Sequence, residues 1–389
     1  MTDTLDRSTA AKALGRVLRQ GAWSNVVARV EARQAGADPS NTQALVYAVL
    51  RALPHFDQAI EAAAHRPVDS IEPPVLDLMR VGLAESAGGR TPIPLIVDSI
   101  VHAVRQESPR AAGFANAVLR RATHDVGEID QIEQIGVPLF VDEALRHVLD
   151  PVQVDALWWA SQEPAAVGLR SDTPIPGAVD VPGIPDAWLW TAGRPPDGVA
   201  VQDPASVAVG NAVGAEDEDR VLDCAAAPGG KTAHLASRTR TPVVALDRSR
   251  RRVEDAARRV PDASWVVGDG RRLPFGESTF DRVLVDAPCT GLGTLRRRPE
   301  IRYRVTPADT ARLAAIQRAM LAEAIRVARP GGRVVYSVCT FTPAETIDVV
   351  AGLGGRAPEG LAGTPFGDGW LLAPHLGPTD GMFICVFDR

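Results

Sequence analysis

Apolar residues recur at three- and four-residue spacings from about residue 10 to residue 123. This spacing places them on one face of a helix, and breaks rich in proline and glycine, such as "EPP" at 72–74 and "GGRTPIP" at 88–94, separate the stretches. The pattern predicts an all-α domain over residues 1–125. The positions that carry it are Leu14, Val17, Leu18, Leu45, Ala48, Val49, Leu53, Leu78, Met79, Leu83, Phe114, Ala117 and Val118.

A middle region follows in which the helical pattern gives way to turns. Two further helices are expected between Val137 and Ser161, and the next stretch, "SDTPIPGAVDVPGIPDAWLWTAGRPPDGVAVQDPAS", is rich in proline and glycine. Short apolar runs between frequent turn residues favour short strands. We therefore interpret residues 137–205 as a small α+β middle domain.

The remainder, residues 206–389, alternates short β-branched runs with amphipathic helical stretches such as "SRRRVEDAARRV" and "TPADTARLAAIQRAMLAEAIRVARPGG". Buried strands that alternate with helices indicate an α/β fold with a doubly wound, mostly parallel sheet of Rossmann-like type. Ligands of such sheets bind at the carboxyl ends of the strands, so the residues that follow the apolar runs are the candidates for a site. The runs lie at 221–222, 243–246, 265–267, 283–285 and 334–336.

Charge and cysteine content narrow the class of protein. The 389 residues include 42 Lys and Arg against 48 Asp and Glu, a formal net charge of −6, so nucleic acid has to bind through local basic patches. The first residues lack a basic segment followed by an apolar core, and no run approaches the about eighteen apolar residues of a membrane span. We therefore expect a cytoplasmic protein with no membrane partner. Four widely spaced cysteines without a C-x-x-C pair predict free thiols rather than a metal site or a disulfide framework.

The first of the apolar runs leads into a glycine-containing loop, "VLDCAAAPGGKT", with a helix expected to begin near Lys231. Gly229 and Gly230 permit a ligand to approach the backbone, and the exposed amides of a helix start suit a carboxylate or a phosphate. The "GGKT" run invites comparison with a phosphate-binding NTPase loop. That pattern requires glycine at the position held by Ala225, which disfavours the NTPase interpretation.

Acidic residues follow three successive strands of the predicted sheet: Asp223, Asp247 and Asp269. Asp247 comes seventeen residues after Gly230, close to where an acidic residue binds the ribose hydroxyls in a dinucleotide site. A single acidic strand end is commonplace as a helix cap. Three of them beside a glycine loop favour a nucleoside pocket.

Two cysteines also follow apolar strands, Cys289 in "VDAPCTG" and Cys339 in "VVYSVCT". A free cysteine is most often a small buried core residue. Both of these follow their strands at the edge where ligands bind, which favours a chemical role. Cys224, behind the loop, and Cys385, within "MFICVF", are interpreted as core residues.

Four motifs in the same order along the chain, "DCAAAPGGKT", "VDAPCTGLGTLRRRPEIRYR", "YSVCT" and the terminal "DGMF", resemble those of RNA cytosine-5 methyltransferases. The resemblance is to the RsmB/Sun/Fmu branch, which modifies small-subunit ribosomal RNA. The helical segment with "AAGFANAVLRR" resembles the NusB-like RNA-binding domain of that branch. The resemblance implies S-adenosyl-L-methionine as cofactor and small-subunit rRNA as partner, with an unpaired or flipped cytosine as target.

The chemistry of such a reaction explains the residue types. Carbon 5 of cytosine is a poor nucleophile, so a thiolate adds at carbon 6 and makes carbon 5 reactive, and a base later removes the carbon 5 proton. By resemblance, Cys339 is the nucleophile, Cys289 assists release, Asp286 holds the ring, and Lys231 lies in the site. The cofactor-binding set implied by the resemblance is Ala225, Ala226, Ala227, Pro228, Gly229, Gly230 and Lys231 around the methionine part, Asp247 at the ribose, Asp269 near the adenine, and Asp286 at both cofactor and cytosine.

A basic run follows the Cys289 loop and is the expected RNA-facing surface, because arginines beside a base pocket can bind phosphates without setting sequence preference. Two other functions stay open on the residues alone. A non-catalytic ribosome-assembly factor keeps the fold and binds RNA, and a DNA cytosine-5 methyltransferase uses the cysteine of the Pro-Cys pair, Cys289, as nucleophile. The arginines of the run are Arg296, Arg297, Arg298, Arg302 and Arg304.

Overall fold

A computed structural model describes residues 3–389, and these residues form two compact units. The first consists of the chain up to Leu139 together with Arg297–Arg304, and the second of Phe140–Arg296 and Val305–Arg389. This division differs from the expected three domains in two respects. The middle region belongs to the second unit, and eight residues from within the sequence of the predicted catalytic domain belong to the first.

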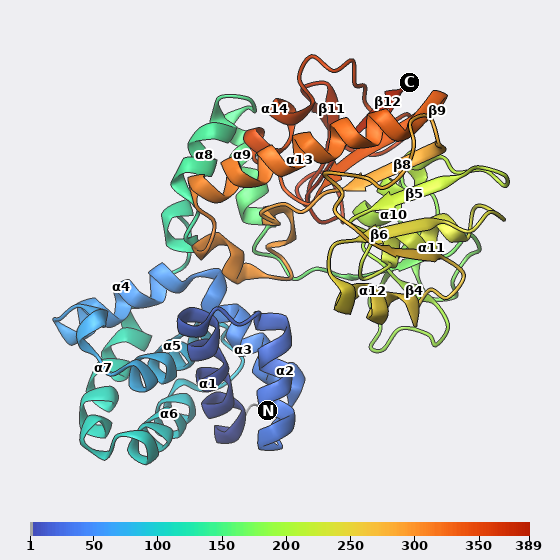
Figure 1. Cartoon of the computed structure of the whole chain (residues 1–389). Helices are drawn as coiled ribbons and strands as arrows, with labels where there is room; N and C mark the ends of the chain where they lie inside the picture. Colours follow the sequence, from blue (N-terminus) through green and yellow to red (C-terminus); the bar gives the residue numbers. More distant parts are fainter. Residues whose placement is uncertain (1–2) are drawn as a thin grey trace. The chain divides into compact units, whose positions relative to one another are not determined.

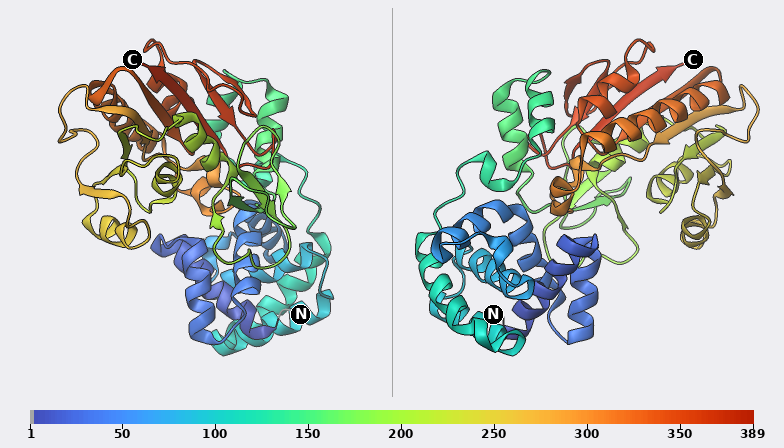
Figure 2. Two further views of the ribbon diagram at one scale, coloured as in Figure 1. Left: turned by 90° about the vertical axis from the view of Figure 1, so that its right-hand side faces the viewer. Right: turned by 60° about the vertical axis from the view of Figure 1, so that its left-hand side comes forward.

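The first unit is helical, as its apolar spacing predicts. Its described residues form seven α-helices, which are coloured blue to teal in Figures 1 and 2. Its core contains Leu14, Leu50 and Met79, each fully buried. Helix ends follow local chemistry: α1 ends where Gly21 adopts a left-handed backbone (φ 68°) and its N–H bonds the Arg16 carbonyl. The helices are α1 (Thr4–Gln20), α2 (Ser24–Ala35), α3 (Pro39–Arg51), α4 (Leu53–Ala64), α5 (Pro73–Ala87), α6 (Ile93–Glu107) and α7 (Ala112–Asp125), with short 3₁₀ turns η1 (Val68–Ser70), η2 (Pro109–Ala111), η3 (Ile132–Ile135) and η5 (Pro299–Tyr303).

The second unit combines helices with two sheets. The two helices expected between residues 137 and 161 are present as α8 (Leu139–Arg146) and α9 (Pro151–Ala160). Its other helices are α10 (Pro204–Val213), α11 (Gly230–Ala236), α12 (Arg250–Ala257), α13 (Pro307–Val327) and α14 (Ile347–Val350), with η4 (Leu292–Thr294) and η6 (Pro343–Glu345). Its strands are β1 (Val167–Arg170), β2 (Val179–Asp180), β3 (Ala187–Trp190), β4 (Ala200–Val201), β5 (Val221–Cys224), β6 (Val244–Asp247), β7 (Ser264–Val267), β8 (Phe280–Asp286), β9 (Ala328–Val338), β10 (Thr364–Phe366), β11 (Gly369–Leu372) and β12 (Met382–Asp388).

The larger sheet of the described chain has eight strands in the order β10-β11-β12-β9-β8-β5-β6-β7. The block from β9 to β7 is parallel, and β12 pairs antiparallel with β9. Each of the five predicted apolar runs lies, to within one residue, in one strand of the parallel block, which confirms the doubly wound fold. Chain order reverses between β5 and β8, so the crevice at the carboxyl ends of these two strands is the expected ligand site.

Helices pack on the faces of this sheet, against the strand side chains that project alternately to its two sides. α13 contacts β8 and β9, in front of which it is drawn in Figure 1. α10, which the sequence analysis did not predict, shares an apolar core with Leu284 of β8 and Val335 of β9. The strands that carry the site are therefore fixed by buried side chains, and their carboxyl ends are held in register.

The middle region forms a four-stranded sheet of order β2-β3-β1-β4, in agreement with the short strands expected there. Val181, Ile184 and Ala187 are buried in the same apolar core as α10 and the larger sheet. A shared core explains why this region is not a compact unit of its own. Within residues 3–389, no helix combines the length and the apolar character needed to cross a membrane.

Candidate active site

The loop after β5 turns sharply and leaves its backbone accessible. Ala225 and Gly229 both adopt left-handed conformations (φ 62° and 99°), which bring the chain from the end of β5 to the start of α11. Apart from its chain neighbours and the backbone of its own helix, no described atom lies within 4 Å of the position that a Cβ on Gly230 would occupy. Asp223, fully buried below the loop, accepts a hydrogen bond from the Thr232 hydroxyl (2.6 Å), and among the described residues its Oδ1 atom has no partner. Burial raises the pKa of Asp223 to about 7.

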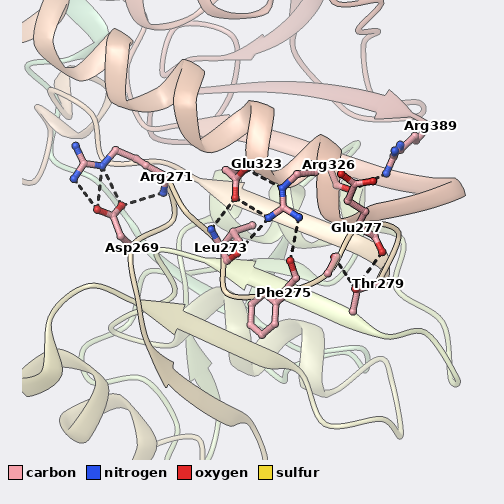
Figure 3. A network of polar contacts seen from close by, with 10 residues as sticks. Asp269, Arg271, Leu273, Phe275, Glu277, Thr279, Glu323, Arg326 and Arg389 are labelled. Atoms are coloured by element: carbon pink, nitrogen blue, oxygen red, sulfur yellow. Dashed lines mark hydrogen bonds and ion pairs between the residues drawn. The ribbon is translucent and has the colours of Figure 1, made fainter.

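Asp247 and Asp269 follow β6 and β7 at the same edge of the sheet, but their surroundings differ. Asp247 is buried, and its carboxylate accepts hydrogen bonds from the backbone N–H groups of Ala227 (3.2 Å) and Ser249 (2.9 Å). Asp269 is partly exposed and is paired with Arg271 (Figure 3), whose guanidinium lowers the pKa of that carboxyl to about 2. Asp247 therefore shapes the glycine loop directly, whereas Asp269 is a charged group of the rim.

Lys231 and Asp286 form an ion pair between the carboxyl ends of β5 and β8, with 2.8 Å between Lys231 Nζ and Asp286 Oδ2. The Ser337 hydroxyl donates to the other carboxylate oxygen, Oδ1 (3.1 Å). Burial alone lowers the pKa of Lys231, but the charge and hydrogen bond of Asp286 outweigh it and raise that pKa. The site thus contains a fixed ammonium–carboxylate pair at the switch point of the sheet.

The two cysteines that follow β8 and β9 meet at this edge. The Sγ atoms of Cys289 and Cys339 lie 3.3 Å apart, and both residues are partly accessible. The hydrogen bond with Cys339, together with burial and the nearby carboxylates of Glu345 and Asp286, raises the pKa of Cys289 well above its ordinary value. A negative charge on Cys339 therefore disfavours ionisation of Cys289, so the two thiols do not ionise independently.

The other two cysteines are buried core residues, as expected. Burial raises the pKa of Cys385 to about 12 and that of Cys224 further still. All four cysteines are free thiols. Because a thiolate rather than a thiol is the nucleophile, the accessible pair is the better candidate for covalent chemistry.

The two thiol loops are joined by backbone hydrogen bonds at Gly293, a residue that the sequence analysis did not select. Its N–H donates to the Cys339 carbonyl (3.0 Å), and its carbonyl accepts from the Gly381 N–H (2.8 Å). A Cβ on Gly293 would lie 2.0 Å from the Gly381 carbonyl oxygen, so only glycine fits. This contact gives the terminal "DGMF" motif a structural role beside the thiols.

Five polar side chains behind the thiols were also not selected from the sequence. A threonine directly follows Cys289 and Cys339, and this repetition is the signal that could have found Thr290 and Thr340. The five are Thr290, Gln317, Thr340, Thr342 and Glu345, and the last four are fully or almost fully buried.

The five arginines expected to face RNA lie in both units. Arg296 belongs to the second unit and donates to the carbonyls of Glu163, Pro164 and Thr379. Arg298, which is exposed, lies over the Trp23 ring at 5.5 Å within the first unit. Arg297, the remaining arginine before the proline, is partly buried.

Arg302 and Arg304 have partners that differ from the expected phosphates. Arg302 is 4% exposed and donates to the carbonyls of Arg51 and Ile135 (3.3 and 2.7 Å). Arg304 donates to the carbonyls of Val17 and Ala22 (2.9 and 2.6 Å), at the carboxyl end of α1. The expectation of an RNA contact is corrected for Arg302, because its guanidinium is buried within the helical unit. For Arg304, some of the guanidinium N–H groups already donate to carbonyl groups of the chain.

Comparison with known proteins identifies the family. Residues 211–387 match the model of the 16S rRNA methyltransferases RsmB/F, and residues 4–124 match the NusB family. A Mycobacterium tuberculosis protein, Rv1407, is 35% identical over 441 residues that cover 98% of this chain and 96% of the relative. The ribosomal RNA small subunit methyltransferase B of Thermus thermophilus is 33% identical over 91% of this chain and 85% of its own length. The chain belongs to the RsmB/F family.

A solved structure agrees with this assignment at the level of the fold. The crystal structure of PH0851 covers 100% of this chain and 99% of its own with a TM-score of 0.80 at 18% identity. As a member of the RsmB/F family, the protein is an RNA methyltransferase that depends on S-adenosylmethionine, and it has a NusB-family domain at residues 4–124. The open backbone at Gly230 and the partnerless Asp223 oxygen fit a polar cofactor at the β5 loop.

Proposed function

We propose that this protein methylates carbon 5 of a cytosine in small-subunit (16S) rRNA in the cytoplasm, through a covalent bond between Cys339 and carbon 6 of that base. The observation that carries the proposal is the 3.3 Å distance between the Cys289 and Cys339 sulfur atoms at the carboxyl edge of the sheet. The reaction requires one thiol to attack and a second group close to the adduct to complete release. Two thiols in contact supply both.

We assign the attack to Cys339 because the pKa of Cys289 is raised well above its ordinary value, which disfavours the Cys289 thiolate. In the proposed step the Cys339 sulfur bonds to carbon 6, and the electron pair of the ring double bond moves toward nitrogen 3. The same electron pair makes carbon 5 nucleophilic. S-adenosylmethionine, held by the β5 loop and Asp247, supplies the electrophilic methyl group.

Asp286 and Lys231 are placed to hold the base while charge enters its ring. The Asp286 carboxylate, fixed by Lys231 and Ser337, can accept a hydrogen bond from the exocyclic amine. The Lys231 ammonium can donate toward nitrogen 3 as negative charge develops there. Polar groups fixed before the reaction stabilise developing charge without further rearrangement.

Release requires the carbon 5 proton to leave and the carbon–sulfur bond to break. We assign this role to the Cys289 thiolate: after adduct formation the Cys289 thiol gives its own proton to solvent, and its sulfur then takes the carbon 5 proton. The proton on nitrogen 3 returns to the Lys231–Asp286 pair as the double bond between carbons 5 and 6 re-forms and expels the Cys339 thiolate. The largest cause of the raised Cys289 pKa is its hydrogen bond with Cys339. Once Cys339 is bonded to the base that cause is lost, so formation of the adduct favours the thiolate form of the group that resolves it.

The decisive experiment compares wild type with Cys289→Ala and Cys339→Ala. Each protein is incubated with S-adenosylmethionine and unmodified small-subunit rRNA, and protein–RNA adducts are resolved on a denaturing gel. We expect a stable adduct with Cys289→Ala, none with Cys339→Ala, and methyl transfer by wild type with 5-methylcytosine as the product. Cys385→Ala is the control for loss of a thiol, because Cys385 is buried away from the site.

Other outcomes select the alternative functions. An adduct that requires Cys289 and forms on duplex DNA would identify a DNA cytosine methyltransferase. RNA binding without methyl transfer or adduct would identify an assembly factor that keeps the fold. A methylated base other than cytosine would refute the proposed substrate.

A further inference from the structure

A fully buried carboxylate, Glu345, lies behind the two thiol loops and is not among the residues assigned to the reaction. It ends the short turn η6, six residues after Cys339 in the chain. Its side chain is 0% exposed. A carboxylate buried to this degree is costly unless donors surround it, so its partners reveal why it is there.

Four donors reach the Glu345 carboxylate, and two of them come from the residue after Cys289. Oε1 accepts from the Thr290 N–H (2.9 Å) and from Gln317 Nε2 (3.1 Å). Oε2 accepts from the hydroxyls of Thr290 (2.6 Å) and Thr342 (2.7 Å). Thr342 lies three residues after Cys339, so the carboxylate is bonded to both thiol loops at once.

The hydroxyl groups form a chain whose direction follows from counting protons. Thr290 donates its single hydroxyl proton to Glu345. Its hydroxyl oxygen must therefore accept the hydrogen bond from the Thr340 hydroxyl at 2.9 Å. Thr340, the residue directly after Cys339, therefore donates. The order is Thr340 to Thr290 to the carboxylate, and it links the residues adjacent to the two thiols.

Two further contacts fix this arrangement from behind. The amide of Gln317 on α13 donates to the Pro288 carbonyl (2.9 Å) as well as to Glu345, so both flanks of Cys289 are held. The Tyr336 hydroxyl donates to the Glu345 backbone carbonyl (2.7 Å). Glu345 is thereby attached through its carboxylate to α13 and through its backbone to β9.

We propose that Glu345 is a positioning residue that holds the Cys289 and Cys339 loops together and so keeps the two thiols in contact. The catalytic consequence rests on the proposed function, in which one thiol attacks and the other completes release. The geometric consequence, which is the contact between the two thiols, does not rest on that function. The effective concentration of one thiol at the other is a property of the folded chain without RNA or cofactor.

The test measures that effective concentration in the full-length protein by equilibration with glutathione. One glutathione disulfide oxidises the pair, with a bond between the Cys289 and Cys339 sulfur atoms and two reduced glutathione molecules as products. We expect Glu345→Ala to lower the effective concentration at least about tenfold, because small displacements of reacting groups cost large factors. Glu345→Gln should lie between wild type and Glu345→Ala, since its amide oxygen still accepts from Thr290 and Gln317 and the threonine hydroxyls can rotate.

Asp281→Asn is the matched control. Asp281 is a buried carboxylate at the opposite end of β8 that accepts from the Arg220 N–H and touches neither thiol loop. It should leave the thiol equilibrium unchanged. If Glu345→Ala does not fold, Thr290→Val removes only the hydroxyl link and should still lower the effective concentration.

Methyl transfer supplies the second readout. With Glu345→Ala we expect kcat to fall while the KM for S-adenosylmethionine stays within about twofold, because the Glu345 carboxylate is bonded to Thr290, Gln317 and Thr342 rather than to the β5 loop. A folded Glu345→Ala or Thr290→Val protein with the wild-type thiol equilibrium would overturn the positioning role. A wild type that transfers no methyl group would instead defeat the proposed function and leave the thiol result standing.

Discussion

The Cys289 thiol lies 3.3 Å from the sulfur of Cys339, and this contact is the first cause of its raised pKa. Charged or titratable groups from three other positions face the same thiol: Asp286 at the end of β8, Glu345 in η6 and Tyr336 in β9. The contact thus ties the protonation of the proposed release group to the state of the proposed nucleophile. This dependence can be measured without substrate.

Replacing Cys339 by alanine should lower the pKa of Cys289. The hydrogen bond and the negative charge of Cys339 both raise that pKa, so their removal favours the thiolate, while burial, Glu345 and Asp286 continue to oppose it. The rate of Cys289 alkylation by iodoacetamide, followed by mass spectrometry across pH, should therefore rise at lower pH in Cys339→Ala than in wild type. Cys385→Ala provides the background profile. Identical profiles for Cys339→Ala and wild type would show that the two thiols titrate independently.

Glu300 should contribute strongly to the stability of the helical unit. Helix α2 begins at Ser24 without a side-chain cap from its own N-cap residue, and Glu300, 1% exposed, accepts from the Ser24 N–H (2.9 Å) and hydroxyl (2.6 Å). A carboxylate at a helix start satisfies a free donor and opposes the positive end of the helix dipole. We expect Glu300→Ala to lower the free energy of unfolding by about 2–3 kcal/mol.

Hydrogen exchange at the first amides of α2 locates this effect in the correct unit. Exchange there should accelerate in Glu300→Ala and remain unchanged in Glu107→Ala, which removes an exposed acid at the end of α6. Equal exchange in wild type and Glu300→Ala would mean that water replaces the carboxylate at no cost.

The arginines after the Cys289 loop should divide into two groups by their effect on RNA binding. Arg298 is exposed, so Arg298→Ala should weaken rRNA binding and reduce the slope of log K against log salt by about 1. Arg302 is buried and bonded to carbonyls of the helical unit, so Arg302→Ala should lower the melting temperature and leave the salt slope unchanged. Titrations of labelled rRNA at several salt concentrations distinguish the two. A salt slope lowered by Arg302→Ala would restore the original expectation for that residue.

The contrast among these arginines shows where sequence reasoning stopped. Apolar periodicity located the helical unit and the five parallel strands because each buried face repeats with the period of its element. It did not identify the segment 297–304 as part of the helical unit, since contacts over more than 200 residues leave no local pattern. From the sequence alone, a run of charged residues predicts an exposed surface. Here two of its arginines cap carbonyl groups instead.

The candidate site shows the same division. Residues at strand ends, such as Asp286, Cys289 and Cys339, could be predicted because parallel strands bring their carboxyl ends to one edge. Glu345 and Gln317 could not, because their role depends on the direction of side chains in a short turn and on a helix. The repeated threonine after each cysteine was visible in the sequence, but its meaning required the hydrogen bonds.

His234 should make the second unit sensitive to acid. It is fully buried in α11 against Gly210, and within the part of the chain that the structure describes neither ring nitrogen has a hydrogen-bond partner. Burial, with the positive charges of Arg170 and Arg238, lowers the pKa of His234 to about 3. The unfolded chain, with an ordinary histidine pKa of about 6.5, binds more protons below that pH, so this histidine contributes stability that is lost as pH falls from about 6.5 toward about 3.

In His234→Phe that loss should be absent, and the fall in the free energy of unfolding between pH 7 and pH 5 should be smaller than in wild type by about 2 kcal/mol. Denaturant titrations at the two pH values measure the difference, and His147→Phe, an exposed histidine of the same unit, should match wild type. A wild-type loss that persists in His234→Phe would place the acid-sensitive group elsewhere.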